Sequence, residues 1–410
     1  MQANGSSSAR AALWTALVCA LIPIVCLAIP MYVIWPFRPQ QADQLAFALT
    51  LRRFAPWIST LCALAAIYAV IAAFMRPIRV MSRVVLVGLA AISTVACCLT
   101  FVNIFEVMFH PYPAPAFGPV NAALVDAEDK VLSVKIGGEA HAYPIRMMGY
   151  HHIVNDSVGN VPIAVTYCTL CHAGLVWSRV LDGATLHFRL AGINNGNALM
   201  RDEETNSIWQ QSTGQAIFGP FKGRQLQLIH SDELTFALWR AEEAQGLVLK
   251  PDAEYSSHYE TKDWEKQVES THTVIDTRKS GIGPHELMLG ILMPGESKAY
   301  PVKDILAARL IQDQVDGTNI LLVVGPDDAS LRVFQADIDG GPATFVPLQK
   351  VPQSGNGGIM QDSWTASVWD FRGCAIQGKL AGHCLKPIDS NKDFWFDWMN
   401  HHPSTKIFKG

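Results

Sequence analysis

Three long apolar stretches without charged residues occupy the first quarter of the chain, over 11–35, 54–75 and 84–102. Each reaches or nearly reaches the roughly 20 residues that a helix needs to cross a bilayer. We therefore predict a membrane region over residues 1–109 with three transmembrane helices. The first stretch lacks a strongly basic start and is too long for a signal peptide, so we expect it to be retained.

The pattern changes after about residue 110, where short β-branched or alternating runs follow one another. Gly137-Gly138 and Asp182-Gly183 separate such runs and are typical of tight hairpin turns. Aromatic residues at helical spacing predict helices within 233–245 and 392–401. Strands outnumber helices, so we expect an all-β or β-rich α+β fold. The predicted strands are 131–136, 140–143, 161–167, 175–180 and 185–190.

This soluble region contains an internal repeat. The sequence Gly-Glu-Ala-His-Ala-Tyr-Pro at 138–144 returns as Gly-Glu-Ser-Lys-Ala-Tyr-Pro at 295–301, and further matches follow at similar offsets. We therefore predict a duplicated domain, with one repeat unit over 120–249 and a second over 285–409. The polar residues 250–284 are expected to form the connecting loop.

Charge is distributed as unevenly as hydrophobicity. The chain has a net charge of −4, yet residues 1–109 hold seven arginines and only two acidic residues, so the remainder is acidic. An acidic domain does not suggest a nucleic-acid partner. The arginines slightly favour a cytoplasmic N-terminus. We thus expect a multi-pass protein of the cell (inner) membrane, in contact with the lipid bilayer, whose soluble domain is extracytoplasmic.

The most distinctive local motif is Cys168-Thr169-Leu170-Cys171-His172 at the end of a predicted strand. The second repeat has Gly325 and Asp328 in place of the cysteines, so the scaffold does not require the pair. Four interpretations stay open: a structural disulfide, a redox dithiol, a soft-metal site, and covalent haem c at the Cys-x-x-Cys-His spacing. Haem c is disfavoured because a strand precedes the motif.

A soft metal such as copper would need further ligands. Thiolates of Cys168 and Cys171 could combine with imidazole and thioether groups of the same repeat. His151 could alternatively act as a proton acceptor for a thiol. The neighbouring pair His151-His152 is, like the cysteine pair, absent from the second repeat. The additional candidate ligands are His151, His152, His172, His187 and Met200.

The other cysteines have different expected roles. Cys374 and Cys384 stand ten residues apart around Gly378, a spacing that suits a cross-hairpin disulfide in an extracytoplasmic domain. The remaining five lie within the apolar stretches, where we expect packing rather than chemistry. These five are Cys19, Cys26, Cys62, Cys97 and Cys98.

Several ordered motifs resemble one bacterial and archaeal family, known only as a domain of unknown function and marked by Thr-Tyr-Cys-Pro-Leu-Cys. The motifs include Thr166 to Cys171, Met200 to Trp209 and Phe394 to Thr405. The resemblance covers most of 120–409 and implies an exported or membrane-anchored domain without an established activity. This chain departs from the family where Thr169 replaces Pro, His172 replaces Gly or Asn, and His152 replaces Glu.

Together these observations predict a membrane-anchored protein with a thiol-redox or soft-metal site centred on Cys168 and Cys171. The alternative is a non-catalytic assembly or binding module whose cysteine pair is a structural disulfide. A protein partner is expected, but the sequence does not identify it.

Overall fold

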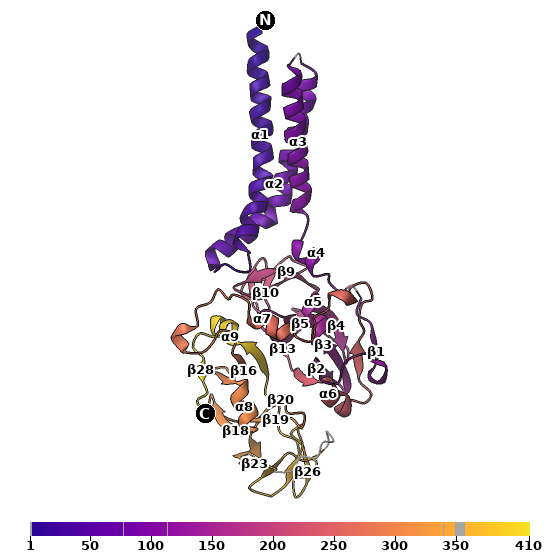
Figure 1. Cartoon of the computed structure of the whole chain (residues 1–410), viewed down its shortest axis with the longest axis vertical. Helices are drawn as coiled ribbons and strands as arrows, with labels where there is room; N and C mark the ends of the chain where they lie inside the picture. The colour runs from indigo at the N-terminus through magenta and orange to yellow at the C-terminus, as the bar shows by residue number, and fades with distance from the viewer. Residues whose placement is uncertain (1, 77, 113, 339, 349–356) are drawn as a thin grey trace. The chain divides into compact units, whose positions relative to one another are not determined.

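The computed structural model describes residues 2–76, 78–112, 114–338, 340–348 and 357–410 (Figure 1). The chain forms two compact units, and each is described by itself. The first unit comprises Met1–Met108 with Ala191–Asn195, and the second comprises Phe109–Leu190 with Gly196–Gly410.

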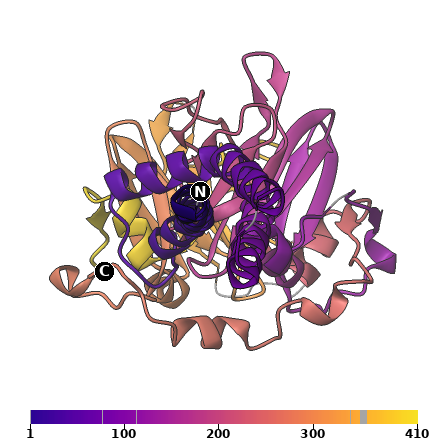
Figure 2. The ribbon, with the colours of Figure 1, turned by 90° about the horizontal axis from the view of Figure 1, so that it is seen from above.

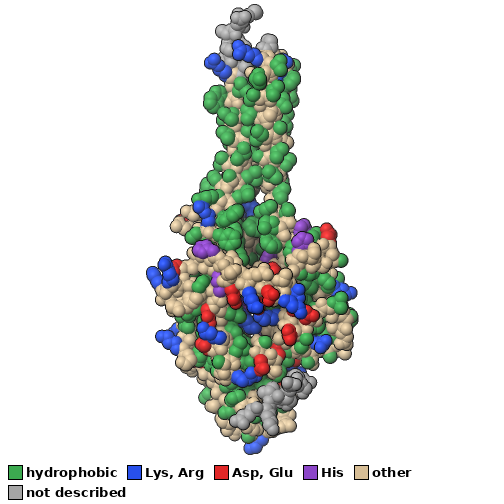
Figure 3. All heavy atoms as spheres, viewed as in Figure 1, with side chains coloured by type: hydrophobic (Ala, Val, Ile, Leu, Met, Phe, Trp, Pro, Cys, Tyr) green, Lys and Arg blue, Asp and Glu red, His purple; other side chains and the backbone are tan. Residues whose placement is uncertain are grey.

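The first unit is helical, with α1 (Gln2–Val33), α2 (Ala42–Phe74), α3 (Val80–Thr100) and the short α4 (Ile104–Met108). Three of these helices are long and apolar enough to cross a membrane, over Arg10–Val33, Ala42–Phe74 and Val80–Thr100. In Figure 3, hydrophobic side chains cover the visible face of these three helices. Helix α2 begins at Ala42, well before the apolar stretch at Phe54, because Arg52 and Arg53 interrupt the apolar run without interrupting the helix.

Small residues line the inside of this helical unit. Ala16 and Ala66 are fully buried, and Cys19 and Cys62 pack in one cluster with Ala66. Small side chains let helix backbones approach closely, which is how helices associate in lipid. Four of the five cysteines here are buried and agree with a packing role, whereas Cys98 is exposed.

The second unit is rich in β-structure. A first series of elements includes the strands β2 to β15, and a second series includes the strands β16 to β28. The first series, with the elements that precede it, is β1 (Phe117–Pro119), η1 (Val120–Ala122), β2 (Lys130–Ile136), β3 (Glu139–Pro144), α5 (Ile145–His151), β4 (Ile153–Val158), β5 (Val161–Cys168), β6 (Ala173–Ser178), β7 (Val180–Leu181), β8 (Ala184–Thr185), β9 (Phe188–Asn194), β10 (Asn197–Asp202), β11 (Ile208–Gln210), β12 (Ala216–Phe218), β13 (Leu228–Ile229), β14 (Asp232–Thr235), α6 (Phe236–Glu242) and β15 (Leu247–Leu249).

The second series follows a connecting segment, residues 250–284, which carries η2 (Ser256–His258), α7 (Trp264–Glu269) and η3 (Arg278–Ser280). Figure 2 shows this salmon-coloured segment along one side of the unit. The second series is β16 (Leu287–Leu292), β17 (Ser297–Pro301), α8 (Val302–Ala308), β18 (Leu310–Val315), β19 (Thr318–Val324), β20 (Leu331–Gln335), β21 (Asp337–Ile338), β22 (Gly341–Pro342), β23 (Phe345–Pro347), β24 (Met360–Asp362), β25 (Val368–Trp369), β26 (Ala375–Gln377), β27 (Ser390–Phe394), α9 (Trp395–His401) and β28 (Lys406–Ile407).

The two series run in the same order and pair their strands alike. Strand β3 pairs antiparallel with β2 and parallel with β15, and β17 pairs antiparallel with β16 and parallel with β28. The indole nitrogens of Trp209 and Trp369 donate to Asp202 at 2.8 Å and to Asp362 at 2.9 Å, respectively. This parallel order supports the duplication predicted from the sequence, which stays a prediction.

Two hairpin turns form at the residues that predicted them. Gly137-Gly138 joins β2 to β3, and Asp182-Gly183 joins β7 to β8, all four residues having positive φ. That backbone conformation matches the two-residue turns of twisted hairpins. The helices predicted from 233 and 392 begin later, at Phe236 and Trp395, because the residues before them pair as strands with β2 and β16.

One hydrophobic core is shared by the two series. Val131 and Trp239 of the first series belong to the same buried cluster as Leu321 and Trp369 of the second. Smaller clusters belong to one series each, such as that of Val154 and Val165. The shared cluster thus joins the two series, in addition to the clusters that each series buries by itself.

A basic side chain lies at the same place in both series, buried in the first and half-buried in the second. In the first, His141 contacts Asp156 and Glu139, each at 2.8 Å, and Tyr143 donates to Asp156. In the second, Lys298 contacts Asp313, to which Tyr300 donates. Burial lowers the pKa of His141 by opposing the imidazolium form. The two carboxylates raise it through their hydrogen bonds and their charges, and this effect is the larger, so the pKa of His141 is raised.

The raised pKa of His141 predicts a pH-dependent stability that His141→Lys removes. Because the folded-state pKa lies above the unfolded value of about 6.5, the stabilisation is complete below that pH. It is lost as pH rises through the raised pKa, and each tenfold difference in proton affinity between the folded and unfolded chain contributes about 1.4 kcal/mol. Lysine stays charged over this range, so we expect the free energy of unfolding of the variant to decline less between about pH 6 and about pH 9. The measurement is denaturant unfolding of both proteins in detergent, and parallel declines would contradict the assignment.

Candidate functional site

The two cysteines of the Cys-x-x-Cys motif close a short connection between two strands. Cys168 ends β5, and Ala173, its cross-strand partner, begins β6. Cys168 and Cys171 form a disulfide with 5.5 Å between their Cα atoms. Cys171 is fully buried and Cys168 is 4 % exposed.

The turn between β9 and β10 covers both sulfur atoms. The carbonyl oxygen of Gly196 lies 3.5 Å from Sγ of Cys168 and 3.4 Å from Sγ of Cys171. Gly196 has a φ of +97°, and a Cβ atom there would lie 2.8 Å from the ring of Phe396. Glycine suits this position because φ is positive and because a side chain here would collide with the ring of Phe396.

Asn197, buried beside the disulfide, connects it to other polar groups. Its Nδ2 atom lies 3.3 Å from Sγ of Cys171, 2.9 Å from Oδ2 of Asp397 and 3.0 Å from Oε1 of Gln211. Its carbonyl oxygen accepts from Gln210, which fixes the orientation of the amide. An amide nitrogen carries two hydrogens, so three acceptors compete for them.

Asp397 and Asp393 come from the second series and are both buried. The amide of Phe394, between them in sequence, donates to the carbonyl of Cys171 at 2.8 Å. Burial, and then the charge of Asp397, raise the pKa of Asp393 well above its usual range. Two carboxyls that are buried close together favour the state in which one of them is protonated.

A second polar group lies on the His172 side of the disulfide. Nε2 of His172 contacts Glu265 at 2.8 Å, and Lys130 contacts the same oxygen at 2.6 Å. Burial opposes ionisation of Glu265, but His172 and Lys130 lower its pKa to about 2. Within the described part of the chain, Nδ1 of His172 and the hydroxyl of Tyr167 are buried without a hydrogen-bond partner.

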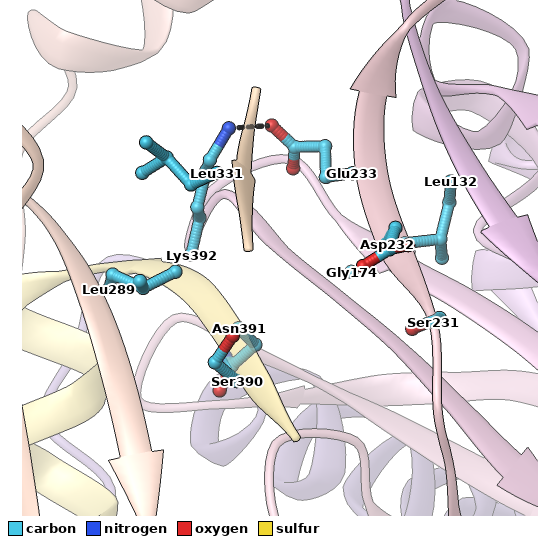
Figure 4. A pocket seen from close by; sticks show the side chains of 10 residues that line it. All are labelled: Leu132, Gly174, Ser231, Asp232, Glu233, Leu289, Leu331, Ser390, Asn391 and Lys392. Carbon is cyan, nitrogen blue, oxygen red and sulfur yellow. Dashed lines mark hydrogen bonds and ion pairs between the residues drawn. The ribbon is translucent and has the colours of Figure 1, made fainter. Parts of the chain in front are cut away.

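The structure also contains a small pocket where the two series meet. It encloses about 350 Å³, part of it open to solvent. In Figure 4, Glu233 of β14 and Lys392 of β27 point toward one another, and their charged atoms are 3.0 Å apart. The pair fills part of the space, and the rest of the lining includes Leu132, Gly174, Ser231, Leu289, Leu331 and Ser390.

The histidine pair predicted as ligands faces other partners. His151 ends α5, and its ring nitrogens contact the carbonyl of His110 at 2.7 Å and the hydroxyl of Tyr259 at 3.2 Å. His152 contacts the carbonyl of Tyr167, and burial lowers its pKa to about 4. Both side chains therefore hold the neighbouring backbone and aromatic residues in place.

The remaining candidates are likewise dispersed. Met200 is buried in β10, opposite Trp209, and His187 pairs with Glu204 at 2.8 Å. Across the described residues, no group of three or more His, Cys, Asp or Glu side chains is arranged to hold a metal ion. The structure thus gives the soft-metal hypothesis no support. Nor does it favour haem c, since the two sulfurs are joined to each other and His172 is bound to Glu265.

The sequence analysis did not predict three residues of the site: Asn197, Glu265, and Asp397, which lies within the motif from Phe394 to Thr405. Comparison of the repeats contained a signal for Asp397, because the offset of 159 aligns it with Leu238 and aligns Asp393 with Leu234. Glu265 lies in the segment expected only to connect the repeats, and no local pattern marks it. The expected pair Cys374–Cys384 does form a disulfide.

Comparisons with known proteins identify a family but no activity. No curated protein and no solved structure matches the chain. A family model described as "Protein of unknown function (DUF3179)" matches residues 112–405. That match spans the whole disulfide site and most of the chain, and the chain therefore belongs to this family of proteins of unknown function.

Proposed function

We propose that Cys168 and Cys171 form a thiol–disulfide exchange centre in a membrane-anchored protein. The observation that carries this proposal is the set of buried polar groups around the disulfide, which includes Asp397, Asp393 with its raised pKa, and the amide of Asn197. Buried polar groups are costly unless they are paired or used, and unusual proton affinities concentrate at functional sites.

The second series supplies an argument against a purely structural disulfide. Its corresponding connection, between β19 and β20, is held by Asp327, whose carboxylate accepts from Ser330 and from Thr235 at 2.6 Å. A carboxylate with several hydrogen bonds therefore keeps this connection in place without cysteines. The cysteine pair and its polar surroundings are additions to a scaffold that does not depend on them.

Exchange at this centre can be written with balanced electrons and protons. A thiolate of a dithiol substrate attacks Sγ of Cys168, the sulfur–sulfur bond breaks, and Cys171 leaves with the electron pair. The second substrate thiolate then attacks the mixed disulfide and releases Cys168. Two electrons and two protons pass to the cysteines, and the substrate becomes a disulfide; the reverse reaction oxidises the cysteines.

We place the second unit outside the cytoplasm. Two disulfides in one domain support an oxidising compartment, and the arginine distribution along the first unit agrees with that orientation. The substrate is then a thiol-containing protein or small molecule of that compartment.

A redox titration tests the exchange function. In the full chain in detergent, we expect the Cys168–Cys171 pair to be reduced at a potential above about −300 mV, because structural disulfides resist reduction to lower values. The measurement is alkylation at defined glutathione ratios, followed by mass spectrometry of the peptide that carries both cysteines. Cys374–Cys384 is the internal control and should stay oxidised. A Cys168–Cys171 pair that also stays oxidised would support the structural alternative.

The two cysteines are also expected to differ in trapping a partner. Because Cys171 is fully buried, attack occurs at Cys168, and the remaining thiol resolves the mixed disulfide. Cys171→Ser should therefore accumulate mixed disulfides through Cys168, several-fold above Cys168→Ser. Non-reducing gels of membranes from cells that express each variant measure this difference. Equal trapping by both variants would contradict the assignment of Cys168 as the attacked sulfur.

A further inference from the structure

Two corresponding loops each contact the other series. They are the loop between β5 and β6, which carries the disulfide, and the loop between β19 and β20. The amide of Phe394, at the start of α9, donates to the carbonyl of Cys171 at 2.8 Å. In the other half, the amide of Thr235, at the start of α6, donates to Ser330 at 3.1 Å. The β5–β6 loop therefore lies against the start of α9 after β27, and the β19–β20 loop lies against the start of α6 after β14.

The residues that face these two loops differ in one respect. A Cβ atom at Gly325 would lie 3.3 Å from Leu238, so an apolar side chain covers the loop that lacks cysteines. At the aligned position beside the cysteine loop stands Asp397, and Asp393 stands where the other half has Leu234. Leucines thus serve the packing role in one half, and packing alone does not explain the carboxyls in the other.

Two buried carboxyls at this position are costly for stability. Their mutual repulsion and loss of hydration are relieved when one of them keeps its proton. Oδ1 of Asp393 has no hydrogen-bond partner among the described residues. Nε2 of His401 lies 3.4 Å from Oδ1 of Asp397. Both carboxyls are thus buried away from bulk water, and the pKa of Asp393 is raised.

Asn197 connects the carboxyl of Asp397 to the leaving sulfur. Oδ2 of Asp397 and Sγ of Cys171 both lie within hydrogen-bond distance of the same Nδ2 atom of Asn197. Cys171 is fully buried, so a thiolate formed there has no water to hydrate it. A thiolate without a proton or a strong donor leaves slowly, and a nearby acid accelerates its departure.

We infer that Asp397, together with Asp393, is the proton source for Cys171 during disulfide exchange, so that the site is assembled from both series. This inference rests on the proposed exchange function. When the bond between the sulfurs breaks, Cys171 takes the electron pair and then the proton of the carboxyl pair. The carboxyl pair then takes up the proton that the attacking substrate thiol has lost. In the reverse reaction the pair accepts the proton of the Cys171 thiol.

The test is the rate at which dithiothreitol reduces Cys168–Cys171 in the full chain in detergent. Asp397→Asn is the informative variant, because its side-chain oxygen can still accept from Asn197 but carries no acidic proton. We expect it to slow reduction at least tenfold, and to slow reoxidation by oxidised glutathione by a similar factor. The equilibrium between the two forms should change little, because both forms of the cysteine pair are uncharged.

Two further variants keep the inference falsifiable. Asp393→Asn removes the other member of the pair and should slow reduction similarly, which covers the case that Asp397→Asn does not fold. Asp370→Asn is the matched control, since Asp370 is fully buried but pairs with Arg372; its rate should stay within about twofold of the wild type. Folding is checked by the thermal midpoint.

The outcomes separate this inference from the function on which it rests. A wild-type pair that dithiothreitol cannot reduce overturns the exchange function itself. A reducible wild-type pair, with Asp397→Asn and Asp393→Asn folded and reduced at the wild-type rate, overturns only the role of the carboxyls. If Asp370→Asn slows reduction as much as Asp397→Asn and Asp393→Asn do, the cause is general destabilisation. That result would also overturn the role of the carboxyls.

Discussion

The contacts that join the two series are the interaction on which the second unit depends: the β5–β6 loop contacts the start of α9, and the β19–β20 loop contacts the start of α6. Phe394 holds the cysteine loop through the carbonyl of Cys171, and Thr235 holds the opposite loop through Ser330 and Asp327. Each series therefore contributes to the surroundings of a loop of the other series. The shared hydrophobic cluster joins the same two series through apolar packing.

Buried charges in this unit fall into two groups. Some are fully paired across the two series, such as Arg332 with Asp232 and Glu242, and Lys392 with Glu233. Their pairing offsets the loss of hydration, which is the usual condition for a buried ion pair. Around the disulfide, several buried polar atoms instead have no hydrogen-bond partner among the described residues, including those of Tyr167, His172 and Asp393. The proposed exchange site is thus a place where the pairing of buried polar groups is incomplete.

Parts of the fold follow directly from local sequence. The long apolar stretches produced helices that can span a membrane, and the Gly-Gly and Asp-Gly pairs produced hairpins with positive φ. Helix starts were less predictable, since residues 233–235 have a helical spacing but pair with β2. The seven-residue helix α5 was also missed, because it is too short to show a periodic pattern. In both cases a tertiary partner decided the conformation.

The sequence by itself determined the membrane region, the β-rich class, and the cysteine motif as the place to look for chemistry. It did so because run length, turn residues and the spacing of Cys168 and Cys171 are local properties. Only the tertiary structure decided which groups surround the cysteines. It separated His151 and Met200 from the disulfide and brought Asn197, Glu265 and Asp397 toward it. Those residues lie far apart in the chain, and the contacts between the two series that assemble them leave no periodic signal in the sequence.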